Sequence, residues 1–486
     1  MKMITPVFFS LVLQSATVSA NEQIVTLGDS LSFAYEAEFC FTKTVTGVGT
    51  IGDNMPQTTR NWIEILSNPT YRGDRFELGA RDSVTVTPPS ADPPFTLYFR
   101  QGYNWSIPGT KVHDLRQFLA GQATFTSIIN SDPDFSTLSS LLPYSDFNDA
   151  TDFALPDLES QIQATAERVT VMIGGNDIKA AYGPIYDGTS SGEAFVNDFM
   201  VDLTAILDRL KTLNPNIQIV VANVPHVGIT PRIRTSWPYD VVKTERVSAV
   251  LRDLNSRIAA LVATRNLGLA DLYTATLSML SGTMKLCIHG VTFVVDGTSS
   301  GNVSGNLGNV WLNGPISKNF HPHTCAQAVI ANEVIRAFNN RYHTGIAPLS
   351  ATEMLVGLLA KTASSIDIAY ANWILRFVPS SPPASDDSDG DGIPAGMEFA
   401  LGLNPARNDS DLMSSGIVGS NMELAYPTRL PTSTQYTLVP ESSTSLTTPF
   451  TPFATPPVQA ADGLFHAKLP LGAARGFLHL KAVLTP

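Results

Sequence analysis

A serine and a histidine, far apart in the chain, occupy positions suited to a nucleophile and its base. Ser30 lies in the tetrapeptide Gly-Asp-Ser-Leu, residues 28–31, directly after the apolar run Ile24–Leu27. His321 precedes Pro322 and a segment with the apolar spacing of a helix. A serine hydroxyl becomes an effective nucleophile when an adjacent base takes its proton. Alone, a serine after a strand is more often the cap of the next helix.

Two further motifs favour chemistry over capping. Residues 174–177, Gly-Gly-Asn-Asp, close the apolar run Val169–Ile173 and bring the Asn176 amide to a strand end. Gly109 lies in the turn Asn104–Thr110, where the missing side chain lets its backbone N–H approach a substrate. Parallel strands bind ligands at their carboxyl ends, so we expect these groups to meet at one edge.

The order of these motifs resembles that of the SGNH/GDSL hydrolase family, over roughly residues 24–342. The resemblance implies a flavodoxin-like three-layer α/β/α fold and hydrolysis of carboxylic esters without a cofactor. It assigns Ser30 as the nucleophile and His321 as the general base. The N–H groups of Ser30 and Gly109 and the side chain of Asn176 would form the oxyanion hole. Loss of one such donor typically costs on the order of 10²–10³ in turnover.

The chain departs from the family at the position three residues before His321, where an Asp is usual and Lys318 stands instead. A cation there disfavours the imidazolium form of the histidine. Three explanations remain open. Another carboxylate or a backbone carbonyl orients His321, with Asp296 as a candidate; the enzyme works slowly as a dyad; or catalysis has been lost.

Three features near these motifs have simpler interpretations. His323 is a rival base, but the family pattern favours the histidine directly before proline. Trp62 lies in a short helical segment and is expected in the core. The Gly-, Ser- and Asn-rich stretch Val291–Trp311 is expected to form a loop that shapes substrate access.

The elements that must position these groups follow from unbroken apolar runs, which are typical of strands covered on both faces. Such runs alternate with stretches of helical apolar spacing, which indicates a parallel sheet with helices on both sides. The runs are 24–27, 169–173, 217–224 and, more weakly, 267–271; the helical stretches begin near 195, 247 and 326.

Beyond about residue 346 the composition and the apolar pattern of the sequence change. A helical stretch over 350–377 leads into the Pro- and Ser-rich segment 379–383, a boundary. An acidic run follows, and then Thr-, Pro- and Ser-rich sequence with short alternating apolar pieces. We therefore predict a signal peptide at 1–20, a hydrolase domain at 21–345, a connector at 346–384, a calcium-type loop at 385–405 and a small mainly-β module at 406–486.

The acidic run fits a calcium-binding loop. Carboxylates stand at its first, third and fifth positions, a glycine at the sixth and a glutamate at the twelfth. The expected ligands are Asp387, Asp389, Asp391, the carbonyl of Ile393 and Glu398. The proline-rich lead-in leaves no entering helix, so the loop resembles the half-sites of dockerin and thrombospondin type-3 repeats. That resemblance implies a structural or cell-surface attachment role. A solvated acidic linker is the alternative.

Composition limits the partners. The 486 residues carry a formal net charge of -12 and contain no long basic run, which argues against nucleic acid. Residues 1–20 have the basic start, apolar core and small terminal residues of a secretory signal peptide. No other segment is long and apolar enough to cross a membrane. The pairing of the three cysteines, at 40, 287 and 325, stays open.

The sequence thus predicts a secreted, periplasmic or cell-surface esterase or lipase acting on a small-molecule, lipid or carbohydrate ester. The lack of a long apolar lid favours short acyl or carbohydrate esters. The alternative is a catalytically impaired binding protein that keeps the fold, as Lys318 would suggest.

Overall fold

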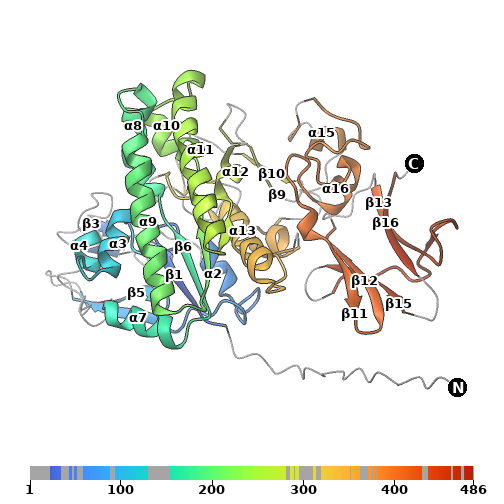
Figure 1. Ribbon diagram of the computed structural model, residues 1–486, viewed down its shortest axis with the longest axis horizontal. Helices are drawn as coiled ribbons and strands as arrows, with labels where there is room; N and C mark the ends of the chain where they lie inside the picture. Colours follow the sequence, from blue (N-terminus) through green and yellow to red (C-terminus); the bar gives the residue numbers. More distant parts are fainter. Residues whose placement is uncertain are drawn as a thin grey trace, which may run out of the picture.

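A computed structural model of the chain consists of a parallel α/β domain and a C-terminal region of small antiparallel sheets (Figure 1). The structure describes residues 22–33, 43–45, 49–51, 59–87, 93–129, 154–277, 279–280, 285–288, 291–294, 310–312, 319–350, 352–361, 370–374, 377–378, 380–428, 436–460, 464–471 and 476–484.

The central sheet has four strands in the order β1-β6-β7-β8, and each neighbouring pair is parallel. Isolated parallel bridges from Gln23 to Glu77 and from Thr26 to Asn104 extend hydrogen bonding beyond the outer side of β1. The strands are β1 Ile24–Gly28, β6 Arg168–Met172, β7 Gln218–Ala222 and β8 Gly268–Ala270.

Alternate residues of each strand enter two different cores, because side chains of a strand point to opposite faces. Val25 and Leu27 belong to one hydrophobic cluster, and Ile24 belongs to the other. In β7, Val221 joins the first cluster and Val220 the second. With both faces covered, the domain has three layers.

Helices of the first layer pack on the face of Val25, and helices of the second pack on the face of Ile24. The first set is α3 Val112–Leu119, α7 Leu155–Ala164, α8 Gly175–Asp187, α9 Glu193–Leu213 and α11 Val241–Thr264. The second set is α2 Trp62–Leu66, α12 Leu272–Leu277, α13 Thr324–Tyr342 and the π-helix η4 Thr352–Leu358.

The α/β domain also contains shorter strands and helices. They are β2 Lys43–Val45, β3 Gly49–Ile51, β4 Arg81–Val86, β5 Phe95–Gln101, α4 Phe125–Ile129, η3 Val227–Ile229, α10 Pro231–Ser236, β9 Lys285–Ile288 and β10 Val291–Val294. Strands β2 and β3, β4 and β5, and β9 and β10 form antiparallel pairs.

The C-terminal region contains two three-stranded antiparallel sheets, β11-β12-β15 and β14-β13-β16. Its helices form an aromatic cluster around Trp373 and Phe399, whose ring centroids lie 5.1 Å apart. The elements are α15 Tyr370–Ile374, α16 Ala395–Leu401, η5 Ser410–Leu412, β11 Ser414–Val418, β12 Asn421–Tyr426, β13 Tyr436–Ser443, β14 Thr451–Pro452, β15 Phe465–Pro470 and β16 Phe477–Leu484.

The predicted fold class is confirmed: a parallel sheet lies between helical layers, and antiparallel sheets follow in the C-terminal region. The helical stretch expected over 350–377 is less regular than its apolar spacing suggested. Its described part holds η4 and α15, and Ala360, just after η4, has a positive φ of 49°, which ends a right-handed helix.

Candidate active site

Ser30 lies in the turn that follows β1, and it is 5 % exposed. The carboxylate of Asp29 accepts a hydrogen bond from the Leu31 N–H at 2.9 Å, which fixes this turn. Gly28 passes so close to β6 that a Cβ there would lie 2.3 Å from the Met172 carbonyl oxygen. A larger residue would therefore push the turn, and Ser30 with it, away from the sheet.

His321 reaches Ser30 from the loop before α13. Its Nε2 lies 2.7 Å from the Ser30 Oγ, and the ring is 4 % exposed. The loop is held on both sides of the histidine: the His321 carbonyl accepts from the Leu312 N–H at 3.0 Å, and the His323 N–H donates to the Val310 carbonyl at 2.7 Å. A backbone ladder therefore fixes a histidine that is 291 residues from its partner.

The turn 104–110 lies against the end of β1. The Ile107 N–H donates to the Gly28 carbonyl at 3.0 Å, and the Asn104 side chain donates to the Ser32 carbonyl at 2.8 Å. Gly109 has a φ of +78°, a conformation that favours glycine. Asn176, in the first turn of α8, donates its side-chain amide to the Thr110 carbonyl at 3.1 Å. The turn is thus joined to both β1 and α8.

The N–H groups of Ser30 and Gly109 are the notable donors of this site. Both residues are buried, and among the described residues neither N–H finds a protein acceptor. Buried backbone donors are nearly always paired, so such groups call for an explanation. Two of them, with the Asn176 amide close by, suit an oxygen that becomes negative during a reaction.

Two carboxyl groups, of the buried Asp29 and the partly buried Asp177, support this edge of the sheet. Burial raises the pKa of Asp29 to about 7. Burial, with the nearby Asp29 charge, likewise raises the pKa of Asp177 to about 7. The Asp177 carboxylate accepts from the Val112 N–H at 3.1 Å and so caps the start of α3. Sequence reasoning overlooked both roles, although each Asp sits inside a motif that it had singled out.

The other two buried histidines near the site are held neutral. Burial lowers the pKa of His226, after β7, to about 4, and that of His323 to about 4. His323 accepts a hydrogen bond from the Thr324 N–H through Nδ1 at 2.7 Å, so it caps α13 instead of facing Ser30. Trp62 is fully buried, as a core role requires, and donates to the Ser32 hydroxyl at 3.0 Å.

Two residues from the sequence-based analysis, Asp296 and Lys318, lie outside the described residues. What orients the His321 ring therefore stays a prediction. The predicted access loop, Val291–Trp311, is described only at its ends, where β10 pairs with β9 and Trp311 bridges to Pro322. Cys325 is buried in α13, and burial raises the pKa of its thiol to about 12.

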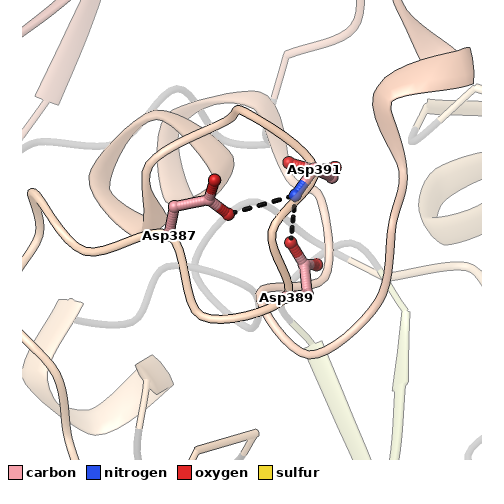
Figure 2. A group of neighbouring side chains, drawn as sticks. All are labelled: Asp387, Asp389 and Asp391. Carbon is pink, nitrogen blue, oxygen red and sulfur yellow. Dashed lines mark hydrogen bonds between the residues drawn. The ribbon is translucent and has the colours of Figure 1, made fainter.

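The acidic loop brings three carboxylates together, as Figure 2 shows. One oxygen from each of Asp387, Asp389 and Asp391 lies within 4.8 Å of the others. Hydrogen bonds from backbone N–H groups hold the loop around these carboxylates. The Gly392 N–H donates to Asp387 at 3.0 Å, and the Asp391 N–H donates to Asp389 at 3.1 Å. The cluster has the size and the oxygen donors that a hard cation takes.

Glu398, the twelfth residue of this loop, is fully buried in α16. Neither of its carboxylate oxygens has a hydrogen-bond partner among the described residues. Burial raises its pKa to about 9, and the nearby carboxylates Asp389, Asp391, Asp409 and Asp387 add to the shift. A buried carboxyl that faces only other carboxyls lacks a positive partner.

The loop is connected to the α/β domain through α13. The Asp409 N–H donates to Asp391 at 2.9 Å, and the Asp409 carboxylate accepts from Arg336 of α13 at 3.0 Å. Arg407 pairs in turn with Glu333 of α13 at 2.5 Å. These side chains are mostly buried, so the acidic loop and the helix that begins beside His321 share one network of charges.

Comparison with known proteins supports one part of this description. The model of the GDSL-like lipase/acylhydrolase family matches residues 144–283, which include Asn176 and Asp177. This match supports a GDSL-type acylhydrolase domain. No curated protein matches the chain. Among the described residues, no helix combines the length and the apolar character needed to cross a membrane.

Several solved structures resemble the chain weakly. An extracellular lipase from Streptomyces rimosus is 12% identical, with 66% of this chain and 99% of that chain covered and a TM-score of 0.32. A carbohydrate esterase family 3 protein from Talaromyces cellulolyticus is 12% identical, with 67% and 100% covered and a TM-score of 0.30. Phospholipase A1 from Streptomyces albidoflavus is 13% identical, with 66% and 100% covered and a TM-score of 0.31.

Proposed function

We propose that the chain is a carboxylic ester hydrolase that acts through an acyl-enzyme on Ser30. The observation that carries this proposal is the 2.7 Å contact between the Ser30 Oγ and the His321 Nε2, beside two buried N–H groups that have no acceptor in the part of the protein that the structure describes. The match to the GDSL-like lipase/acylhydrolase family supports the same reaction class.

In the proposed reaction the Ser30 oxygen attacks the ester carbonyl while His321 takes its proton through Nε2. The carbonyl oxygen becomes an oxyanion, which the N–H groups of Ser30 and Gly109 and the Asn176 side chain stabilise. His321 then gives the proton to the leaving alcohol. Water, deprotonated by the same histidine, releases the acid and restores Ser30. No cofactor takes part.

Orientation of the His321 ring is the unassigned step of this mechanism. We propose Asp296 as a candidate partner, while a Ser30–His321 dyad and a lost activity are the other two explanations. Lys318→Asp distinguishes them. In a dyad, a new carboxylate three residues before His321 stabilises the imidazolium ion and raises turnover. Unchanged or lower turnover in this variant contradicts the dyad.

The test of the proposed function is hydrolysis of p-nitrophenyl esters by the mature protein and by Ser30→Ala. We expect loss of the nucleophile to lower kcat on the order of 10⁶-fold. Ser256→Ala, at an exposed position of α11, is the matched control and should keep full activity. A fluorophosphonate probe should label the wild type and should not label Ser30→Ala. If the wild type and Ser30→Ala hydrolyse the esters equally slowly and the probe labels neither, the results would favour the non-catalytic binding protein.

We also propose that residues 387–398 hold a Ca²⁺ ion, with Asp387, Asp389, Asp391, the Ile393 carbonyl and Glu398 as ligands. The two oxygens of Glu398, which find no hydrogen-bond partner in the described parts of the chain, support this site more directly than the acidic spacing does. The ion would have a structural role, since the loop is joined through Asp409 to Arg336 of α13. Residues 1–20 support export of the protein, and the antiparallel sheets after the loop are the proposed surface-attachment module.

A further inference from the structure

An apolar cavity of about 90 Å³ lies on the α13 side of the central sheet. Most of its walls come from three segments: the loop and η3 after β7, the region of α12, and the first two turns of α13. None of the described residues that line it is acidic, lysine or arginine. Its apolar walls include Leu272, Met279, Trp311, Ala326, Val329 and Ile330.

The cavity adjoins the candidate active site on three sides. Leu31 in its wall follows Ser30, Pro322 follows His321, and Gly175 precedes Asn176. Phe320, on the other side of His321, also lines it, and its ring centroid lies 6.1 Å from that of the histidine. The cavity wall therefore contains the chain neighbours of Ser30, Asn176 and His321, although these three residues do not line it themselves.

Three polar side chains in the wall, those of His226, Thr230 and Thr276, have partners within the protein, and the indole N–H of Trp311 has none among the described residues. The His226 Nε2 lies 3.2 Å from the Ser248 hydroxyl, and its Nδ1 accepts from the Gly228 N–H at 3.2 Å. The hydroxyl of Thr276 donates to the Tyr273 carbonyl at 2.7 Å, and that of Thr230 donates to the Val227 carbonyl at 2.8 Å. Hydroxyl groups of a sugar would lose their water here and gain little in return, whereas methylene groups would gain by leaving water.

We propose that this cavity binds the acyl chain of the ester substrate and selects chains of medium or greater length. The proposal rests on the proposed ester hydrolysis at Ser30. It reverses the expectation from the sequence, which favoured short acyl or carbohydrate esters because no long lid was evident. The apolar space is provided instead by α12 and α13, elements that carry no lid-like sequence pattern.

The test is the ratio of kcat/KM for p-nitrophenyl octanoate to that for p-nitrophenyl acetate. Each buried methylene contributes up to about fourfold, so the wild type should prefer octanoate on the order of a hundredfold or more. Ala326→Phe puts a ring into the cavity and should lower this ratio at least tenfold. Ala260→Phe, exposed on α11, is the matched control and should leave the ratio unchanged.

The possible outcomes separate the two proposals. Ser30-dependent hydrolysis that is fastest with acetate overturns the acyl cavity and leaves the esterase intact. Absence of Ser30-dependent hydrolysis with every ester overturns the esterase. The cavity is then judged by calorimetric binding of octanoate to Ser30→Ala, which Ala326→Phe should weaken if the proposal holds; no binding by Ser30→Ala overturns it. Val329→Phe fills the same space and replaces Ala326→Phe should that variant fail to fold.

Discussion

Two regions of this molecule contain buried carboxyl groups, and these groups find their partners in different ways in the two regions. At the edge of the central sheet, Asp29 and Asp177 accept hydrogen bonds from the backbone N–H groups of Leu31 and Val112. In the acidic loop, both oxygens of Glu398 lack any such donor among the described residues, and the charges nearest to it are other carboxylates.

The difference indicates in which region the protein itself provides partners for the buried carboxyl groups, without a bound ion. Backbone donors come from turns and helix starts that the fold already contains, so the sheet edge needs nothing added. A carboxyl group surrounded by carboxylates stays protonated unless a cation binds, which agrees with the raised pKa of Glu398. The junction between the two regions is intermediate, because there Arg336 and Arg407 supply the positive charge to Asp409 and Glu333.

The largest expected effect is at this junction. Arg336→Met keeps the length of the side chain and removes the charge between Asp409 and Glu333, which are both buried. Removing one partner of a buried ion pair typically costs about 3–5 kcal/mol. Arg407 still pairs with Glu333 and lies 3.9 Å from Asp409, so we expect a loss of about 3 kcal/mol, at the lower end of this range. The free energy of unfolding in urea is the measurement.

The control for this prediction is an exposed pair. Arg257 and Asp253 lie 2.9 Å apart on α11 with about half of each side chain exposed. Arg257→Met should cost below about 0.5 kcal/mol. Equal losses in the two variants would mean that the α13 network does not hold the loop against the α/β domain.

The next effect concerns the proposed calcium ion. At a free Ca²⁺ concentration one hundred times the Kd, binding should stabilise the folded protein by about 2.7 kcal/mol, and the measurement is the change in Tm between calcium and a chelator. Glu398→Gln should lose most of this gain, because a neutral amide is a weaker ligand. In chelator the same variant should equal or exceed the wild type, because wild-type Glu398, with its pKa raised to about 9, must take up a proton on folding, whereas glutamine is neutral in both states.

This reversal of rank between the two buffers is specific to a metal ligand. Glu193→Gln, exposed at the start of α9, should show the full calcium-dependent shift. Identical melting curves of the wild type in calcium and in chelator would leave the acidic loop as a solvated linker, the alternative interpretation of its sequence.

The sequence was sufficient to predict the parallel sheet. It also predicted that Ser30, after one strand, and Asn176, after another, lie at the same edge of that sheet. Unbroken apolar runs mark strands covered on both faces, and a parallel sheet brings their carboxyl ends to one edge. The choice of His321 over His323 depended on the family resemblance. The structure adds a physical reason, since Nδ1 of His323 is used to cap α13.

Other parts of the site could not be predicted, because they depend on contacts between segments without a local pattern. The cavity wall combines Leu31 with residues near 226, 272 and 326, and only the packed fold brings them together. The pairing of Arg336 with Asp409 joins residues 73 apart, each of which looks in the sequence like an ordinary surface charge. The unpartnered oxygens of Glu398 likewise become evident only when α16 is packed.

The smallest expected effect returns to the sheet edge, where Asp29→Asn isolates the cost of charging a buried carboxyl. The folded pKa of Asp29, about 7, lies above its ordinary value of 3.8, so the folded state binds more protons between these values. This contribution to stability is complete below the unfolded pKa and is lost as the pH rises through 7. From pH 6 to pH 8 the loss is about 1.4 kcal/mol.

Asp29→Asn keeps an oxygen for the Leu31 N–H and cannot ionise, so its stability should fall less over this range than that of the wild type. The difference should widen further, because loss of the Asp29 charge also eases ionisation of Asp177. Urea unfolding at pH 6, 7 and 8 measures it, with Asp198→Asn, exposed on α9, as the control. Parallel losses in Asp29→Asn and wild type would mean that backbone donors alone keep Asp29 charged. The two regions would then differ more sharply, since the sheet edge would bear a full buried charge without any cation.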